Sequence, residues 1–256
     1  MLADSMNHSI IKTYLCAIRL LHIDNGLPDP LVNCVKLQRL VKGIKQVKDS
    51  SCPARLAITI ELMRVIHQSL DFSNQDNVMI WAACCLGFFG FLRTGEFTVN
   101  SVFNPDVHMT VSDVQADSED NPTFFKVSIK CAKTDPFRKN CYIYVGRGNT
   151  PICPFVAINN YLEVRGSASG PLFLHRDGSP LSRQKLSCTL QPILHRAGFT
   201  GTHSGYSFRT GAATTAASRG VPDDMIKMLR RWSCDAYEVY INTPVSSILR
   251  VTNQLL

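Results

Sequence analysis

The sequence feature that most restricts the fold is an uncharged, largely apolar run over residues 77–92, which is followed directly by Arg93. A helix built from this run has no charged face to turn toward water, so it belongs in the interior of a domain. The run is shorter than the roughly 20 apolar residues that cross a bilayer. It therefore predicts a buried helix over residues 75–92, no membrane partner, and a charged group at the edge of a core.

The composition is that of a folded protein that suits an anionic partner. The chain has 256 residues, of which 45% are hydrophobic and 18% charged, and its formal net charge is +7. This length accommodates one large domain or a small domain beside a larger one, and the charge suits a polyanion without requiring one. The ten cysteines form no Cys-x-x-Cys pair, which favours reduced, mostly buried thiols over disulfides or a zinc site. We expect an intracellular protein, nuclear in a eukaryotic host.

Two helices are expected at the start of the chain. Apolar side chains recur at helical spacing over residues 9–25, and Gly26 follows as a stop signal. A second helical pattern covers residues 31–44. Two helices are too few for an independent core, so residues 1–48 are expected to be the trailing part of a helical domain whose beginning is missing. Residues 49–55 are polar and broken by proline, which predicts a linker.

Five basic residues of the first segment are candidates for contact with DNA: Arg19, Lys36, Arg39, Lys42 and Lys45. A run of charge along a helix is also typical of a face that simply meets solvent. The sequence leaves both interpretations open.

Residues 56–256 predict a second, larger and mainly helical domain. Thr59 can cap a helix that ends near Leu70. Alternating polarity predicts three strands, over residues 107–114, 124–131 and 141–145. Further helical patterns begin at Pro154 and cover residues 182–197, 207–219, 222–229 and the segment beyond Pro244. The expected fold class is mainly α with a small antiparallel three-stranded β-sheet.

Two arginines are placed to hold a phosphate group. Arginine suits that task because its planar fork pairs bidentately with phosphate and keeps its charge at neutral pH. Arg93 follows the buried helix, where it could equally be a helix-end cation paired with Glu96. Arg209 opens a helix of small residues, which can pack closely beneath a site, although alanines are also simply good helix formers.

The remaining residues that phosphodiester cleavage without a metal requires are an acid for the leaving oxygen and a nucleophile. Lys133 lies in the turn of the predicted hairpin, where lysine is usually a solvated charge. Trp232 is either a core aromatic or a donor to a phosphate oxygen, since its indole nitrogen donates but does not accept. Two tyrosines, Tyr237 and Tyr240, follow it.

The order and spacing of five segments resemble the boxes of the tyrosine recombinase (phage integrase) family. The segments are Leu92-Arg93-Thr94-Gly95-Glu96, the hairpin with Lys133, Tyr206-Ser207-Phe208-Arg209, Arg231-Trp232, and Tyr240-Ile241-Asn242-Thr243-Pro244. The amino-acid sequence of several stretches, such as residues 13–19 and 209–216, is most similar to recombinases of eukaryotic mobile elements.

This resemblance implies domains, roles and partners. Residues 1–48 correspond to the end of a SAM-like core-binding domain and residues 56–256 to the catalytic domain. Tyr240 would be the nucleophile, which leaves Tyr237 a packing residue, and Lys133 the acid. The reaction would be cleavage and rejoining of double-stranded DNA through a 3′-phosphotyrosyl link, without metal or cofactor. Family members work as tetramers on two duplexes, and residues 245–256 are an apolar candidate for the segment traded between subunits, although they could equally fold back onto their own domain.

In the same scheme Arg93 and Arg209 would hold the phosphate, Glu96 would buttress Arg93, and Trp232 would contact the phosphate. Tyr206 occupies the position three residues before Arg209, where the family most often has histidine. A tyrosine of pKa near 10 is a poor proton acceptor at neutral pH, so cleavage is expected to be slow. His203 lies too far from Arg209 along the chain to replace that histidine well.

Three alternatives to a working recombinase remain. A DNA-binding remnant without strand exchange would explain Tyr206 and also Arg230, which stands where related sequences commonly have glycine. A type IB topoisomerase shares the chemistry, but the Leu-Arg-x-Gly-Glu segment favours the recombinase branch. A helical interaction protein with incidental basic charge would bind DNA weakly or without salt dependence.

Overall fold

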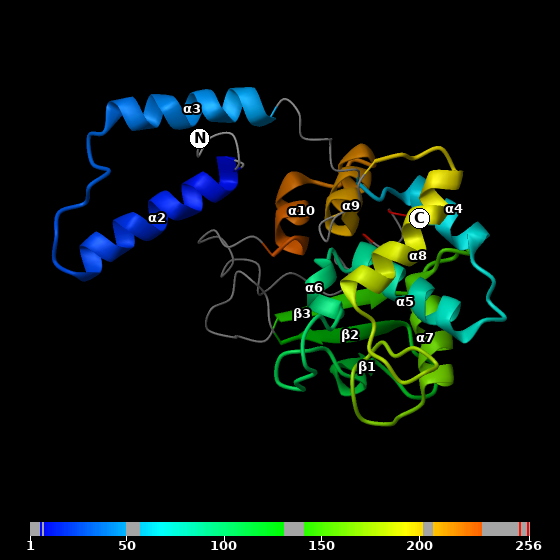
Figure 1. The fold of residues 1–256 in the computed structure, drawn as a ribbon. Helices are drawn as coiled ribbons and strands as arrows, with labels where there is room; N and C mark the ends of the chain where they lie inside the picture. The colour runs from blue at the N-terminus through cyan, green and yellow to red at the C-terminus, as the bar shows by residue number, and fades with distance from the viewer. Residues whose placement is uncertain are drawn as a thin grey trace. The chain divides into compact units, whose positions relative to one another are not determined.

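The structure is a computed structural model that describes residues 8–49, 57–130, 141–201 and 207–231, together with Met6, Val251 and Leu255. The chain divides into two compact units, Met1–Ala54 and Arg55–Leu256 (Figure 1).

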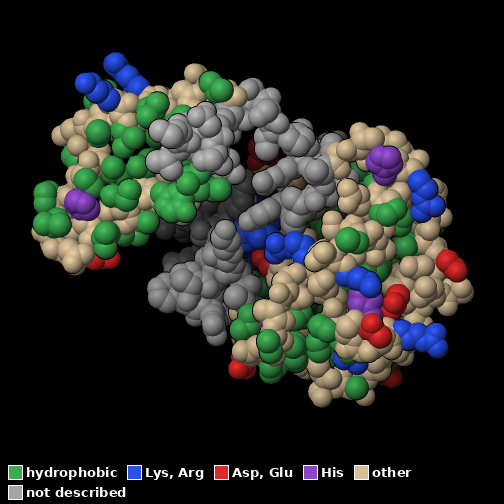
Figure 2. Space-filling model, in the orientation of Figure 1, with side chains coloured by type: hydrophobic (Ala, Val, Ile, Leu, Met, Phe, Trp, Pro, Cys, Tyr) green, Lys and Arg blue, Asp and Glu red, His purple; other side chains and the backbone are tan. Residues whose placement is uncertain are grey.

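The first unit contains two helices, α2 (His8–Asp24) and α3 (Val35–Asp49), which pack against each other. Gly26 ends the first helical segment with a left-handed φ of 69°, as expected of a stop signal. No residue of α2 is buried. Large apolar side chains such as Tyr14, Ile18 and Leu21 are exposed, and Figure 2 shows hydrophobic side chains spread over the face of this unit that it displays.

The second helix differs from its predicted range at both ends. It begins at Val35 rather than near Leu31, because Asp29 accepts a hydrogen bond from the backbone of Leu31 (2.9 Å) and residues 31–33 form a turn. It continues to Asp49, the first residue of the predicted linker. Asp49 is therefore helical, although its polar sequence neighbourhood predicts a linker.

The described part of the second unit holds seven α-helices around a small sheet. They are α4 (Ile60–Ser69), α5 (Gln75–Phe89), α6 (Thr94–Phe97), α7 (Pro154–Arg165), α8 (Arg183–Arg196), α9 (Ser207–Ser218) and α10 (Asp223–Leu229). The helix α5 is central, since it contacts α4, α6, α7 and α9. Every residue from Met79 to Phe89 is buried, which confirms the buried helix that the uncharged run predicts. Among the described helices, none is both long and apolar enough to cross a bilayer.

The end of α5 lies three residues before the predicted end at Leu92. Phe91 takes a left-handed φ of 51°, and the backbone N–H of Leu92 turns back to the Gly87 carbonyl (2.9 Å). A left-handed residue closes a helix in this way, and glycine usually occupies that position. Phe91 accepts the strain because its ring is buried in the core at 1% exposure. Arg93 thus stands on a short connection between α5 and α6.

Three antiparallel strands form the sheet, in the order β1-β2-β3: β1 (Val114–Ala116), β2 (Phe124–Ile129) and β3 (Cys141–Gly146). Val127 pairs with Val114 on one side and with Ile143 on the other. Alternate residues of β2 are buried, as the alternating pattern of a half-buried strand requires. Figure 1 shows the sheet at one end of the unit and α9 and α10 toward the other. The predicted fold class, mainly α with a small three-stranded antiparallel sheet, is confirmed.

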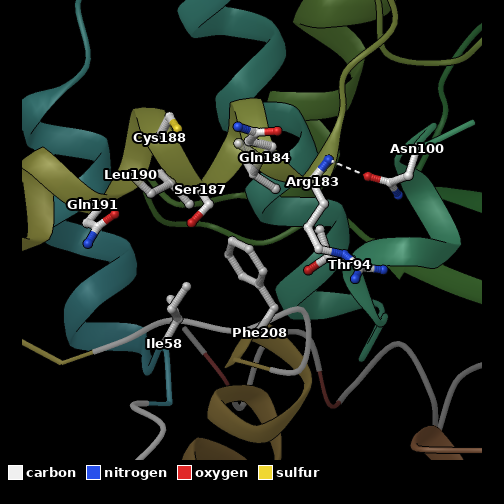
Figure 3. A pocket seen from close by; sticks show the side chains of 11 residues that line it. Ile58, Thr94, Asn100, Arg183, Gln184, Ser187, Cys188, Leu190, Gln191 and Phe208 are labelled. Carbon is white, nitrogen blue, oxygen red and sulfur yellow. Dashed lines mark hydrogen bonds between the residues drawn. The ribbon is translucent and has the colours of Figure 1, made fainter.

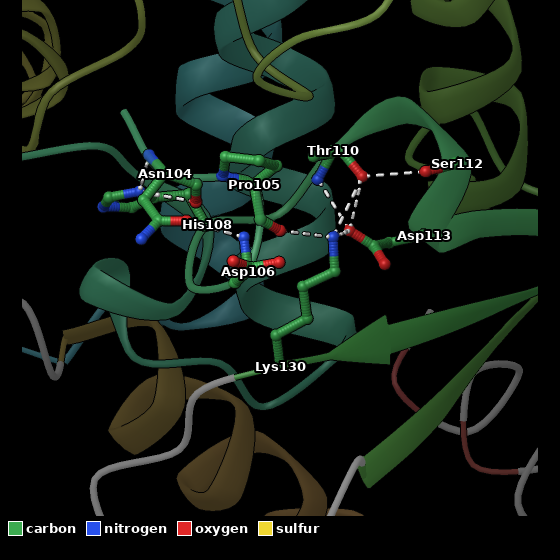
Figure 4. A network of polar contacts seen from close by, with 8 residues as sticks. All are labelled: Asn104, Pro105, Asp106, His108, Thr110, Ser112, Asp113 and Lys130. Carbon is green, nitrogen blue, oxygen red and sulfur yellow. Dashed lines mark hydrogen bonds and ion pairs between the residues drawn. The ribbon is translucent and has the colours of Figure 1, made fainter. Parts of the chain in front are cut away.

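The first strand, β1, shares only Val114 with its predicted range 107–114, so that range is wrong for residues 107–113. A short 3-10 helix, η1 (Val111–Asp113), occupies the end of that range. Asp113 sets this turn, because its Oδ2 accepts hydrogen bonds from the backbone and hydroxyl of Thr110 (2.8 and 2.7 Å). Lys130, directly after β2, reaches the same oxygen at 2.6 Å and the Pro105 carbonyl at 2.9 Å (Figure 4). The network fixes the end of β2 to the loop that precedes β1.

A glycine allows α9 to touch the segment before α4. A Cβ atom added to Gly211 would lie 1.7 Å from the Ile58 carbonyl oxygen. The backbone N–H of Ile58 donates to the Ser207 carbonyl (3.0 Å), so the two backbones run in contact. The small residues of α9 therefore permit close packing, as the sequence predicts.

The described cysteines are free thiols. Cys84, Cys85 and Cys153 are buried, and burial raises the pKa of the Cys84 and Cys85 thiols. Cys16 and Cys188 are exposed, so the expectation of mostly buried thiols is wrong for them, because Cys16 lines an open groove between α2 and α3 and Cys188 lines one beside α8.

Candidate functional site

The centre of the candidate site is the carboxylate of Glu96, in the first turn of α6. Its Oε2 accepts a hydrogen bond from the backbone N–H of Arg93 (2.8 Å), and its Oε1 lies 3.2 Å from the Arg93 guanidinium. The Glu96 side chain is only 4% exposed. The sequence predicts this support of Arg93 by Glu96 three residues later, and the structure places the two side chains in contact.

Arg209 approaches the same carboxylate from α9. Its NH1 lies 4.0 Å from Glu96 Oε1, and the side chain is 2% exposed. Neither NH1 nor NH2 of Arg209 has a hydrogen-bond partner among the described residues. Burial lowers the pKa of Arg209 to about 9, and the positive charges of Arg231 and Arg93 act in the same direction. The free site therefore disfavours its own charge, which a bound anion would offset.

A third arginine, Arg231, completes the cluster. Its NH2 lies 2.6 Å from Glu96 Oε2, and its NH1 donates to the Gly90 carbonyl (3.4 Å). Sequence reasoning named the Arg231-Trp232 pair without giving Arg231 a role. A signal was present, since a glutamate buried beside a core needs cations, and Arg231 lies two residues after the end of α10 at Leu229.

Arg230 stands where the family resemblance leads one to expect glycine, but its backbone does not need the conformational freedom of glycine. Arg230 has φ −75° and ψ −5°, an ordinary right-handed helical conformation, so a side chain there causes no strain. The positive φ belongs to Arg231, at 50°. A left-handed residue with a side chain costs roughly 1–2 kcal/mol, and the contacts of Arg231 with Glu96 and Gly90 are placed to offset that cost.

The arrangement is a cationic cradle with unsatisfied donors. Three guanidinium groups surround one carboxylate, which leaves a formal charge of +2 in a largely buried place. Buried donors without partners are uncommon in proteins and call for an explanation. Guanidinium groups pair preferentially with carboxylate and phosphate oxygens. An oxyanion that accepts from Arg209 would satisfy both the charge and the donors.

Four predicted site residues lie outside the described residues: Lys133, Tyr206, Trp232 and Tyr240. Their roles stay predictions. The described strands β2 and β3 end and begin on either side of residues 131–140, which include Lys133. Among the described residues, no group of three His, Cys, Asp or Glu could hold a metal ion.

The basic candidates of the first unit are all exposed: Arg19, Lys36, Arg39, Lys42 and Lys45. Arg19 forms an ion pair with Asp29 at 2.7 Å, so its charge is partly neutralised within the unit. Lys42 and Lys45 line a groove of about 740 Å³ between α2 and α3. Their exposure fits either a DNA contact or a solvated face.

A separate cavity of about 400 Å³ lies beside α8 in the second unit. Figure 3 shows Ile58 and Phe208 pointing toward that helix, and the Arg183 backbone donating to Asn100 Oδ1 (2.9 Å). None of the arginines of the cluster, nor Glu96, lines it. It is therefore distinct from the cradle.

Comparison with solved structures identifies the fold. The chain is similar to the XerH site-specific recombinase in its pre-cleavage complex with difH substrate, with a TM-score of 0.51 and 12% identity over 94% of this chain and 69% of that chain. It is similar to XerH in a post-cleavage complex, with a TM-score of 0.53 and 13% identity over 78% and 52%. A lambda integrase dimer bound to a COC′ core site gives a TM-score of 0.52 and 13% identity over 98% and 65%.

The chain has the tyrosine recombinase catalytic fold. No protein family and no curated protein sequence matches the chain. The chain spans only part of each of these structures, between 52% and 69% of their length. The structural similarity shows the fold. The sequence identities are too low to carry an activity over to this chain, so its activity has to be argued from its own site.

Proposed function

We propose that the protein cleaves and rejoins DNA at specific sites, in recombination or in integration of a mobile element. The observation that carries the proposal is the cluster of Arg93, Arg209 and Arg231 around Glu96, with the NH1 and NH2 groups of Arg209 buried and without partners. Such a cradle is suited to the oxygens of a phosphodiester. The solved structures that share the fold include site-specific recombinases bound to DNA, which supports a DNA substrate.

The proposed reaction gives a task to Tyr240, Lys133, Arg93 and Arg209. The hydroxyl of Tyr240 attacks the scissile phosphorus and forms a 3′-phosphotyrosyl bond, and its proton passes to water, because Tyr206 is a poor acceptor at neutral pH. The bond from phosphorus to the 5′ oxygen breaks, and Lys133 supplies the proton that this oxygen takes up. Arg93 and Arg209 stabilise the charge that develops on the non-bridging oxygens. Rejoining runs these steps in reverse and conserves the bond energy.

The exposed lysines and arginines of the first unit would contact the DNA backbone, since phosphate contacts position a protein on a duplex. Recombination of two duplexes requires several copies of the chain, so we propose a tetramer in the active complex. We also propose that the protein acts inside the cell, in the nucleus where the host is eukaryotic.

A nicked suicide substrate tests the proposal. Cleavage of such a DNA releases a short fragment and traps the covalent intermediate. The expected result is a protein–DNA adduct that resists denaturing electrophoresis and is lost in Tyr240→Phe. A Tyr237→Phe variant is the matched control and should keep the adduct. Absence of the adduct despite DNA binding would contradict the proposal.

The second candidate is a DNA-binding remnant without catalysis, and Tyr206 is the feature that favours it. A proton acceptor contributes roughly 100-fold or more to such reactions. Tyr206→His should therefore accelerate adduct formation by roughly that factor if the rest of the site is intact. A variant that still forms no adduct would support the remnant.

A further inference from the structure

Glu96 divides its two oxygens unequally among the three arginines. Its Oε2 is held by the Arg93 backbone at 2.8 Å and by the Arg231 guanidinium at 2.6 Å. Its Oε1 lies 3.2 Å from Arg93 but 4.0 Å from Arg209. The carboxylate is therefore drawn toward Arg93 and Arg231 and makes only a long contact with Arg209.

Arg231 and Arg209 differ in how many of their guanidinium nitrogens have hydrogen-bond partners. Arg231 uses NH2 on Glu96 and NH1 on the Gly90 carbonyl, which leaves only its Nε without a partner. Arg209 has both terminal nitrogens buried and without a hydrogen bond among the described residues. A carboxylate so close to a guanidinium would normally form a bidentate pair with it. Contacts of Glu96 with other groups therefore keep its carboxylate from forming such a pair with Arg209.

Arg231 is the group positioned to do so. Its contact with Oε2 is the shortest that Glu96 makes, and its side chain is 8% exposed, so water screens the pair weakly. Without Arg231, Glu96 could turn toward Arg209 NH1, which lies 4.0 Å from its Oε1 and has no hydrogen-bond partner among the described residues. The carboxylate would then occupy the donors that a phosphate needs, and the formal charge of the cluster would fall from +2 to +1.

We propose that Arg231 is a positioning residue that holds the Glu96 carboxylate away from Arg209 and so leaves the Arg209 guanidinium free to bind a phosphate oxyanion. The inference rests on the proposed function for its DNA substrate. It assigns Arg231 no direct contact with the reacting atoms. Loss of Arg231 should therefore weaken phosphate binding, because Glu96 would then occupy the Arg209 donors. Removing the charge of Glu96 as well should restore phosphate binding.

The test uses the full chain, inorganic phosphate as the probe, and titration calorimetry. Arg231→Met should weaken phosphate binding by about 10-fold or more, because the released Glu96 carboxylate would occupy the Arg209 donors and lower the charge that faces phosphate by one unit. Lys227→Met removes the same charge from the exposed face of α10 and should change binding less than about 2-fold. The double variant Arg231→Met with Glu96→Gln should return to within about 3-fold of the wild-type affinity, because two arginines then face no competing carboxylate.

A role of Arg231 in folding alone would not give this rescue, since Glu96→Gln removes a second contact of the cluster. Arg231→Lys, which keeps the charge but lacks the fork, should bind phosphate with intermediate affinity and supplies the measurement if Arg231→Met does not fold. Wild-type binding by Arg231→Met, a double variant as weak as Arg231→Met, or no phosphate binding by the wild type would each overturn the inference.

The adduct assay separates this inference from the proposed function. Phosphate binding that follows the expected pattern, together with no Tyr240-dependent adduct in the wild type, would keep the role of Arg231 and reject cleavage. An adduct formed equally well by wild type and Arg231→Met would keep cleavage and reject the role of Arg231.

Discussion

Replacing Glu96 by glutamine tests the arginine cluster most directly. The substitution keeps the shape of the side chain and removes the one negative charge that three guanidinium groups share, at 2.6, 3.2 and 4.0 Å. Removal of one partner from a buried ion pair costs about 3–5 kcal/mol. The glutamine oxygen can still accept a hydrogen bond from the Arg93 backbone, so we expect the lower end, a loss of about 3 kcal/mol in the free energy of unfolding.

The loss is measured by urea unfolding followed by circular dichroism, and by the melting temperature. For a unit of this size, each 1 kcal/mol corresponds to about 2–4 °C, so the melting temperature should fall by about 6–12 °C. Glu61→Gln is the control, because Glu61 is an exposed carboxylate in the first turn of α4. Its loss should cost less than about 1 kcal/mol.

The cluster also predicts how an anion changes this result. With the carboxylate gone, inorganic phosphate faces three uncompensated arginines and should bind more tightly than in the wild type. Because a ligand that binds only the folded state stabilises it, phosphate should raise the melting temperature of Glu96→Gln more than that of the wild type. A variant within about 1 kcal/mol of wild-type stability, or one that gains no more from phosphate, would refute the reasoning.

Three further predictions follow from the packing and the charge of the described residues. Gly211→Ala should cost about 3 kcal/mol or more in unfolding free energy, because the added Cβ would meet the Ile58 carbonyl at 1.7 Å, whereas Gly43→Ala, with nothing within 4 Å, should be neutral or slightly stabilising. Lys130→Met should cost about 1–3 kcal/mol in the same urea experiment, since it removes a 2.6 Å contact with Asp113; an unchanged midpoint would contradict the role of the network. Binding to duplex DNA in a fluorescence anisotropy titration should weaken about 40-fold between about 50 and 200 mM salt if three phosphates are neutralised, and salt-insensitive binding would exclude a phosphate contact.

The sequence predicts most of the second unit because its signals are local. The buried helix α5 follows from an uncharged run, and α8 lies one residue inside its predicted range at each end, where Ser182 caps it through the Lys185 backbone (3.1 Å). The errors occur where distant contacts decide. The left-handed Phe91 shortens α5 because its ring has a place in the core, and Asp113 turns the chain before β1.

In the candidate site, too, contacts between sequence neighbours could be predicted and contacts between distant residues could not. Arg93 and Glu96 are neighbours in sequence, so their contact could be predicted, and Arg209 was predicted to share a phosphate with Arg93. The contact of Arg231 with Glu96 joins residues 135 positions apart, and no periodicity reports such a distance. Only the general rule that a buried carboxylate needs cations points toward it.

The energetic cost of the cluster is itself an argument about its role. Replacement of a buried ion pair by apolar side chains of similar volume is often neutral or stabilising by about 1–4 kcal/mol. Arg209 is the least favourable member, because it is 2% exposed, stands 4.0 Å from its only counter-charge among the described residues, and repels two other arginines. If position 209 served only to pack the start of α9, an apolar side chain would be more stable there than an arginine.

We therefore expect Arg209→Met to raise the unfolding free energy of the free protein by about 1–2 kcal/mol, as relief of a buried charge predicts, and to abolish stabilisation by inorganic phosphate. Urea unfolding with and without phosphate measures both effects on one sample. A variant that is less stable than the wild type in the absence of phosphate would mean that Arg209 serves the fold. Higher stability together with loss of the phosphate effect would mean that this guanidinium is kept for its ligand, at the expense of the free protein.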